Sequence, residues 1–366
     1  MPYTQFDRKK LKIRPLKNRK NKLKIERDYI DPRTKPEKLS PQAQKIAEET
    51  ASRILEARRN DKAVILAFGA HTIKNGLSPV LIKLMEKNMV THLATNGAGI
   101  IHDWEFSFLG ESGEDVKENV RDGSFGIWDE TGRYINLAII VGAYNKMGYG
   151  ESVGAMIENE ELVLPSREKL KADMSAGSAK LCAAAADLFF IMNEFNIPEG
   201  TMKIPHPWKR FSAQAAAYRM KIPFTGHPMF GHDIIYNHPM NYGAAIGRTA
   251  QRDFLSFANS VSNLDGGVYL SIGSAVMSPM IFEKAFSMVQ NISLQNGKRI
   301  TNHYICVVDI AESKWDWQEN GEPPQNNPAY YLRYCKTFSR MGGTMRYASA
   351  DNRDFLLTLL RELKVV

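Results

Sequence analysis

The stretch AVILAFGAHTIKNGLSPVLIKLMEKNMVTHLATNGAGIIHD, residues 63–103, decides the fold that the sequence predicts. Its first six residues form a continuous apolar run, as expected of a strand that is covered on both faces. Apolar residues recur at helical spacing over 77–85, and residues 91–95 are predicted to form a second strand. The pattern predicts a parallel strand–helix–strand unit. Because open parallel sheets bind ligands at the carboxyl ends of their strands, the polar turns at 71–75 and 96–103 are expected to form the site.

The rest of the chain continues this alternation of strands and helices. Residues 104–133 are a glycine-rich excursion that is longer than an ordinary connection, which is typical of functional segments. Seven strands alternating with helices predict one α/β domain over residues 39–366 with a doubly wound, mostly parallel sheet. Beyond the first unit, the further strands are predicted at 135–141, 222–225, 267–272, 303–308 and 344–347.

The net charge of +8 comes from one segment. Ten of the 48 basic residues lie in residues 8–24, which hold no acid, and the other 38 nearly balance the 40 acidic residues. Residues 1–38 are therefore predicted to be a basic segment that is flexible or draped over the surface. Such a tail can bind nucleic acid or anionic lipid, whereas the nearly neutral body disfavours a nucleic-acid role.

The compartment is predicted from what the sequence lacks. Cys182, Cys306 and Cys335 lie far apart and form no metal or redox spacing, which favours a reducing compartment. The basic N-terminus is not followed by an apolar segment, as a signal peptide would require. The longest apolar stretch, residues 181–192, is too short to span a bilayer. These features predict a cytoplasmic protein without a membrane segment.

Two loops that follow predicted strands carry candidate functional residues. The loop at 227–238 gathers His227, His232, Asp233 and His238, which suit either a polar binding loop or metal ligation. The spacing matches no common metal framework, which favours the binding loop. The sequence also lacks the G-x-G-x-x-G and P-loop patterns. A nucleotide site would therefore use other small residues, such as Asn96, Gly97 and Ala98.

Later candidates lie between residues 309 and 336. Trp315, Asp316 and Glu319 belong to a loop in which tryptophans alternate with carboxylates, a combination that suits a cationic amine with an alkyl body. Lys336 stands in an aromatic-rich helical pattern with Tyr334. Desolvation among aromatics can deprotonate a lysine and make it an imine-forming nucleophile, although an ordinary surface lysine is the simpler interpretation.

The order of these motifs resembles the deoxyhypusine synthase family. Thr95-Asn96-Gly97-Ala98-Gly99 with Asp103 is similar to the family's T-T-A-G-G-V-E-E-D, and Leu109-Gly110-Glu111 is similar to its L-G-E-F. Similar order continues through Gly231-His232-Asp233 and Lys336 to Tyr347-Ala348-Ser349. The resemblance covers roughly residues 40–366 and identifies the chain as a divergent member.

The resemblance implies a Rossmann-like NAD-binding domain in a homotetramer with active sites at dimer interfaces. It implies NAD-dependent transfer of an aminoalkyl group from a polyamine through a lysine imine, to a small amine or a protein lysine. On this chain it implies Lys336 as the imine lysine and Asp233 near the amine. The loop at 227–238 is expected to supply a base in place of the family's histidine, so His232 and Asp233 are the further candidate catalytic residues. Substrate contacts would come from His227, Trp315, Asp316, Glu319 and Tyr334. Cofactor contacts would come from His71, Thr72, Lys74, Asn96, Gly97, Ala98, His102, Asp103 and Ser349.

Two alternatives stay open. Where the family has G-G-G-V-V-K-H-H with a catalytic histidine, this chain has residues 273–279 without one. That difference favours a nucleotide-binding or scaffold relative with altered catalysis. The second alternative is metal-assisted hydrolysis by the loop at 227–238.

Overall fold

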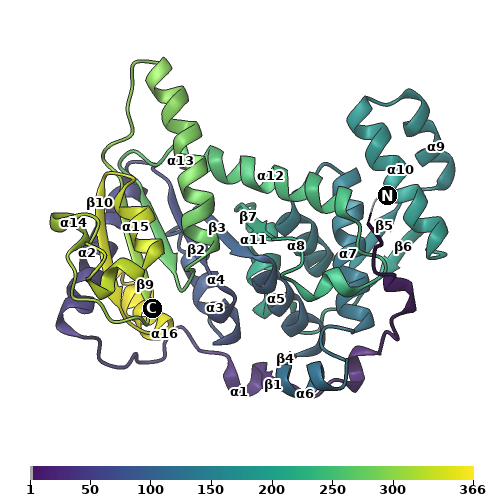
Figure 1. Cartoon of the computed structure of the whole chain (residues 1–366), viewed down its shortest axis with the longest axis horizontal. Helices are drawn as coiled ribbons and strands as arrows, with labels where there is room; N and C mark the ends of the chain where they lie inside the picture. Colours follow the sequence, from purple (N-terminus) through teal and green to yellow (C-terminus); the bar gives the residue numbers. More distant parts are fainter. Residues whose placement is uncertain (1–2) are drawn as a thin grey trace.

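The computed structural model describes residues 3–366 and contains a six-stranded parallel sheet (Figure 1). The strands lie in the order β10-β9-β8-β2-β3-β7. This is the Rossmann order, in which the chain leaves the first strand in one direction and later returns to its other side. The doubly wound α/β fold is therefore confirmed. The strands are β2 (Val64–Phe68), β3 (His92–Asn96), β7 (Phe224–His227), β8 (Val268–Ile272), β9 (Tyr304–Asp309) and β10 (Thr344–Ser349).

Both faces of the sheet are buried, because successive side chains of each strand enter different cores. In β2, Val64 and Leu66 pack into one core, and Ile65 and Ala67 into the other. The first core is completed by α2 (Pro41–Arg59), α4 (Ser78–Glu86) and α16 (Asn352–Glu362). The second is completed by α12 (Gly243–Val261), α13 (Met277–Gln295) and α15 (Arg333–Ser339).

A large helical insertion separates β3 from β7 and forms the other half of the molecule (Figure 1). Two short hairpin strands in it pair antiparallel, β5 (Glu161–Leu164) and β6 (Gly200–Lys203). Its helices are α5 (Gly97–Leu109), α6 (Val116–Arg121), α7 (Asp129–Tyr144), α8 (Tyr149–Asn159), α9 (Arg167–Ala176), α10 (Ala179–Glu194) and α11 (Ala213–Met220).

Two sequence predictions fail, a strand in the insertion and the turns after β2 and β3. The strand predicted at 135–141 lies inside helix α7, where every one of these residues is buried. A helix that is buried all round shows the same continuous apolar run as a central strand, so periodicity does not separate them. The turns predicted at 71–75 and 96–103 are largely helix, α3 (Ala70–Lys74) and the first two turns of α5. The excursion at 104–133 holds the end of α5, β4 (Glu111–Glu114), α6 and the start of α7.

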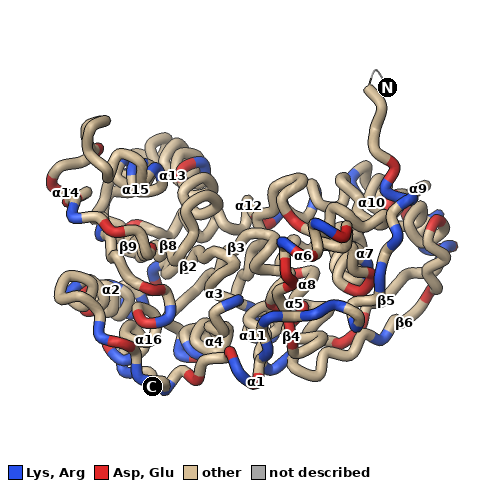
Figure 2. The backbone as a smooth tube through the Cα atoms, turned by 60° about the horizontal axis from the view of Figure 1, so that its bottom comes forward, with Lys and Arg blue, Asp and Glu red and all other residues tan. Residues whose placement is uncertain are grey.

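The sequence predicts an N-terminal segment that is either flexible or draped over the surface. In the structure residues 3–38, here called the strap, are draped over the surface. Its strand β1 (Asn21–Lys24) pairs antiparallel with β4, and Leu16 is buried beside it. The short helix α1 (Ile25–Asp28) follows. Figure 2 shows the strap's basic residues spaced along its path across the helical half. The division into a tail and one domain at residue 38 stays a prediction.

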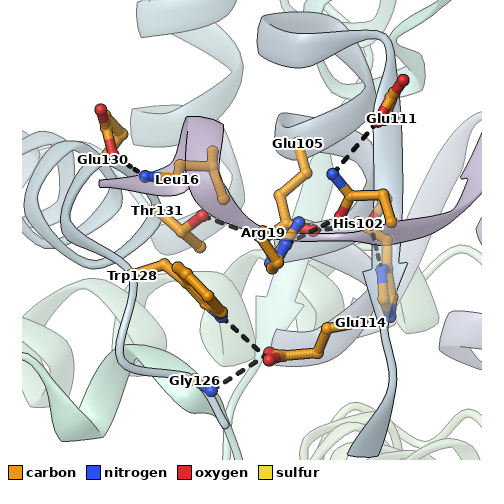
Figure 3. Close-up of polar contacts among 12 residues, drawn as sticks. Leu16, Arg19, His102, Glu105, Glu111, Glu114, Gly126, Trp128, Glu130 and Thr131 are labelled. Atoms are coloured by element: carbon orange, nitrogen blue, oxygen red, sulfur yellow. Dashed lines mark hydrogen bonds and ion pairs between the residues drawn. The ribbon is translucent and has the colours of Figure 1, made fainter. Parts of the chain in front are cut away.

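A buried ion pair fixes the strap to the insertion (Figure 3). Arg19 Nη1 lies 2.7 Å from Glu105 Oε1 on α5, and both side chains are 1% exposed. The same carboxylate accepts hydrogen bonds from Ser112 Oγ at 2.6 Å and Thr131 Oγ1 at 3.0 Å. Burial alone would raise the pKa of Glu105, but the charge and hydrogen bond of Arg19 leave that pKa below its usual value.

Candidate functional site at the carboxyl edge of the sheet

The switch point of the sheet lies between β2 and β8, where the loops after these strands touch. A Cβ atom on Gly69 would lie 2.1 Å from the Gly273 carbonyl oxygen, so only glycine fits there. Gly273 has a φ of +55°, and a Cβ on it would lie 2.3 Å from Asn352 Nδ2 at the start of α16. The backbones of the loops after β2 and β8 are therefore in close contact, and the Asn352 side chain, which follows β10, packs against Gly273.

Two buried polar atoms near this junction have no hydrogen-bond partner within residues 3–366. They are Thr72 Oγ1 on α3 and Asn352 Oδ1. Buried polar groups are nearly always paired, so a pair of unsatisfied atoms at a switch point marks a place for a polar ligand. Of the predicted cofactor residues nearby, His71 is exposed and Ser349, at the end of β10, is half-buried. Burial, followed by the charge of Lys74, lowers the pKa of His71.

A cleft of about 490 Å³ opens beside α3. Its wall is formed by Lys74 and Asn75 of α3, by the start of α16 and by the strap. The strap is fixed here by the backbone N–H of Ile30, which donates to the Gly76 carbonyl at 3.0 Å. The predicted cofactor residue Lys74 therefore faces a space of ligand size, part of whose wall is the strap.

The loop after β7 brings Asp233 against the first residue of α5. A Cβ on Gly97 would lie 2.0 Å from Asp233 Oδ2, so glycine makes room for the carboxyl group. Asp233 is 9% exposed, and Oδ2 is buried without a hydrogen-bond partner in the described part of the chain. Burial raises the pKa of Asp233 to about 7. A carboxyl group with this pKa can both accept and donate a proton near neutral pH.

Two tyrosine hydroxyl groups beside Asp233 also lack hydrogen-bond partners. The Oη atoms of Tyr149, the first residue of α8, and Tyr236 have no hydrogen bond to any residue from 3 to 366. Burial raises the pKa of each hydroxyl above its usual value, and the charge of Asp233 adds to the shift in both. Together the three side chains form the Asp233 cluster, a buried set of one acid and two phenols.

The strands next to this cluster carry a chain of neutral histidines. His227 Nε2 lies 2.9 Å from Thr225 Oγ1, which lies 2.9 Å from His92 Nε2. His92 Nδ1 is bonded in turn to Ser260 Oγ at 2.8 Å. Burial lowers the pKa of both histidines to about 3. His227 is thus held neutral by its surroundings, while His232 is exposed on the following loop.

The geometry gives no support to the metal alternative. Residues 3–366 contain no group of three or more histidine, cysteine, aspartate or glutamate side chains placed to share a metal ion. His238 points elsewhere: its Nε2 lies 3.4 Å from Asp129 Oδ1, and its Nδ1 accepts from the Met240 backbone N–H.

Three predicted cofactor residues on α5 or at its start have internal partners. Asp103 is fully buried and accepts hydrogen bonds from residues 212–214 at the start of α11, so its role is to hold that helix. His102 Nδ1 lies 2.7 Å from Ser112 Oγ, and burial lowers its pKa to about 4. Asn96 Oδ1 caps α5 by accepting from the Gly99 N–H. Asn96 and Ala98 are half-buried, which leaves the amide group of Asn96 able to donate outward.

The other candidates gather at the opposite edge of the sheet. Trp315, Asp316 and Glu319 line a cleft of about 300 Å³ between α2, β10 and α14 (Trp317–Asn320). Asp316 also caps α14 by accepting from the backbone N–H groups of residues 318 and 319. Tyr334 is half-buried nearby.

Lys336 on α15 has a counter-ion. Its Nζ lies 2.7 Å from Glu322 Oε1 and 3.6 Å from the centre of the Tyr330 ring. The hydrogen bond from Lys336 to Glu322 outweighs desolvation, so the pKa of Lys336 is raised. A raised pKa fits an ordinary charged lysine, the simpler of the two interpretations, and is opposite to the lowered pKa of a desolvated, neutral lysine.

The predicted site residues thus fall into two separate sets, one around Asp233 and the other around Lys336. Asp233 follows the edge strand β7, whereas Lys336 lies on α15, in the connection between β9 and β10, the two strands at the other end of the strand order. The sequence analysis missed Tyr149, Tyr236 and Asn352. Tyr236 follows Asp233 by three residues, whereas the sequence near Tyr149 gives no sign of its proximity to Asp233.

No protein-family model matches the chain, and no curated protein sequence matches it either. Several solved structures are similar at low identity. AgrE in a complex with ornithine and NAD⁺ is 15% identical with a TM-score of 0.43, and the alignment covers 89% of this chain and 34% of AgrE. This chain thus spans about a third of AgrE.

Two further solved structures align over most of both chains. A conserved protein of proposed LOR/SDH type from Methanococcus maripaludis S2 is 13% identical with a TM-score of 0.44, covering 90% of this chain and 73% of that one. A proposed deoxyhypusine synthase from Entamoeba histolytica is 9% identical with a TM-score of 0.39, covering 88% and 89%. Because every TM-score is below 0.5, these likenesses add nothing to the functional argument, and family membership stays a prediction.

Proposed function

We propose that this chain is an enzyme that binds an NAD-type nucleotide at the carboxyl edge of the sheet and transfers a proton through Asp233. The observation that carries the proposal is the buried, unpartnered Oδ2 atom of Asp233, with a pKa raised to about 7. An unpaired buried carboxyl group is costly for folding, and perturbed acids of this kind are concentrated at active sites.

The switch point supplies groups that fit a dinucleotide. Gly69 and Gly273 keep side chains out of the junction, while Thr72 Oγ1 and Asn352 Oδ1 are left for hydroxyl or amide donors. Lys74, on the wall of the neighbouring cleft, can face a phosphate. Strand β3 ends in Asn96 rather than in the acid that usually contacts a ribose, and its amide can donate to a ribose hydroxyl instead. A bound nicotinamide would supply hydride acceptance.

The Asp233 cluster suits an amine substrate. A carboxylate flanked by two aromatic rings attracts an ammonium group by charge and by cation–π contact. In its ionised form, Asp233 can take a proton from the amine nitrogen. The neutral His227 beside it accepts or donates a hydrogen bond without competing for the positive charge.

Aminoalkyl transfer through Lys336 is the finer form of this proposal. Since Asp233 follows β7 and Lys336 lies on α15, in the connection between β9 and β10 at the other end of the strand order, such a site would take Lys336 from a second copy of the chain. The predicted homo-oligomer would provide it. Borohydride trapping of a lysine imine, followed by peptide mapping, tests this step independently of proton transfer at Asp233.

The test of the proposal compares two carboxylates at the same edge. We expect Asp233→Asn to lower turnover of amine substrates with NAD by about a hundredfold or more while nucleotide affinity, measured by titration calorimetry, is unchanged. The matched control is Glu312→Gln, an exposed carboxylate in the loop after β9. Full activity of Asp233→Asn, or the absence of NAD binding to the unaltered chain, would contradict the proposal.

A further inference from the structure

A third cleft, of about 640 Å³, lies at the β7 edge of the sheet. It is bounded by the α7–α8 connection, the end of α11 and the middle of α12. Its volume is that of a typical small-molecule site. Neither the proposed nucleotide site nor the Asp233 side chain lines it.

The rim of this cleft carries positive charge without counter-ions. Lys146 and Lys221 reach it from the ends of α7 and α11, and neither has an ion-pair partner among residues 3–366. Arg252 on α12 donates from Nη1 to the carbonyls of residues 143 and 147, at 3.1 and 3.0 Å. These bonds fix its guanidinium and use only one of its nitrogens.

Each acidic side chain in the cleft has an ion-pair or hydrogen-bond partner within the chain. Glu158 is paired with Arg219 at 2.8 Å, and Glu151 accepts from the Gly148 N–H at 3.1 Å. Asp253 is buried and accepts from the N–H groups of Gly150 and Gly226 at 2.8 and 2.6 Å. The charge of Glu151 acts on Arg252, whereas Lys146 and Lys221 have no ion-pair partner among the described residues and keep their charge for a ligand.

One residue that lines the same cleft, Gln214, has a buried acceptor atom without a hydrogen-bond partner in the described chain. Gln214 is 1% exposed, and its Nε2 donates to Ile100 and Asp103. Its Oε1 has no hydrogen-bond partner in the described chain. Because Oε1 can only accept, a ligand that pairs with it must offer a donor such as a hydroxyl group.

The two lysines also adopt a backbone conformation that glycine takes at lower cost. Lys146 has a φ of +63° and Lys221 a φ of +56°. Glycine can therefore adopt the left-handed backbone conformation at either position at no greater cost than lysine. This makes glycine a substitution that removes the ammonium group without straining the backbone.

We propose that this cleft binds a small organic phosphate that carries hydroxyl groups. Lys146, Lys221 and Arg252 would surround the phosphate, whose two negative charges match several cations better than one carboxylate would. Gln214 Oε1 would accept from a hydroxyl group of the same molecule. The proposal is independent of the nucleotide site and of Asp233.

The test uses the full chain with ribose 5-phosphate, inorganic phosphate and ribose as probes, in titration calorimetry at one fixed salt concentration. We expect ribose 5-phosphate to bind more tightly than inorganic phosphate and ribose not to bind. Lys146→Gly and Lys221→Gly should each weaken ribose 5-phosphate about tenfold, the effect of losing one charge-assisted contact. Thermal unfolding of both variants should match or exceed that of the unaltered chain.

Lys364→Gly is the matched control. Lys364 is exposed, has a φ of +56° and lies outside the cleft, so this variant makes the same backbone and charge change. Unchanged binding in Lys364→Gly together with weaker binding in the other two variants supports the site. Equal losses in all three variants, or failure of both phosphates to bind, would overturn it.

Discussion

Two buried carboxyl groups beside helix α5 have opposite surroundings. Glu105, in the body of the helix, is paired with Arg19 and bonded to two hydroxyl groups, and its pKa lies below the usual value (Figure 3). Asp233, against the start of the helix, has an unpartnered oxygen and a pKa raised to about 7. The difference separates a carboxylate that holds the structure from one that is left available to a ligand.

The largest expected effect on stability comes from removing Arg19, the ion-pair partner of Glu105. Arg19→Met should lower the free energy of unfolding by about 3–5 kcal/mol, because it leaves the charge of Glu105 buried without compensation. Denaturant unfolding measures this. Lys24→Met, which removes the exposed partner of Glu111, is the control and should cost about 1 kcal/mol or less. Similar losses in the two variants would mean that Arg19 does not fix the strap.

The second expected effect is an increase in the free energy of unfolding, not a decrease. The pKa of Asp233 in the folded chain exceeds its usual value of 3.8, so the native state favours the protonated form. Stability is therefore lost as pH rises from about 4 to about 7. Asp233→Asn mimics the protonated form and should be more stable than the unaltered chain at pH 8, by on the order of 2–4 kcal/mol.

The pH dependence supplies the control for this second effect. The stability difference between Asp233→Asn and the unaltered chain should shrink as pH falls toward 4, where the unaltered chain is also protonated. Unfolding curves at several pH values measure it. A difference that is independent of pH would show that the substitution acts through packing and not through charge.

The smallest effect is expected at the other edge of the sheet, where Lys336 lies among half-exposed partners. Glu322→Gln should lower the pKa of Lys336, because it removes the hydrogen bond and charge that raise it. NMR of reductively methylated lysines follows this titration. Glu283→Gln, which alters the surface pair of Lys284, should leave Lys336 unchanged. An unaltered pKa in Glu322→Gln would show that Glu322 is not the counter-ion of Lys336.

Local patterns predicted most of the sheet. The strand–helix–strand unit at 63–103 and the strands near 222, 267, 303 and 344 lie within a few residues of their expected places. The signal failed at 135–141, because a fully buried helix and a central strand have the same apolar composition. The short strands of the strap and of the insertion were not predicted from the sequence, because they form by pairing with segments that are distant in the chain.

The site was less predictable, because it depends on which distant residues return to the sheet. Asp233 is correctly placed at a strand's carboxyl end, but its isolation from partners is visible only in three dimensions. The resemblance implies a cofactor contact for Asp103, and its hydrogen bonds from residues 212–214, far along the chain, are visible only in the fold. For Lys336 the sequence left two interpretations open, an ordinary surface lysine and a desolvated one, and the approach of Glu322, which raises its pKa, is visible only in the fold.

The most direct test of the account is the titration of Asp233 itself. Carbon-detected NMR of the chain labelled with ¹³C at aspartate carboxyl groups, compared with Asp233→Asn to assign the resonance, gives its pKa. The account predicts a midpoint near 7, shifted downward when a cationic amine binds. A midpoint at or below the usual value of about 4 would contradict the account, because the carboxylate would then be satisfied within the fold and not held for a ligand.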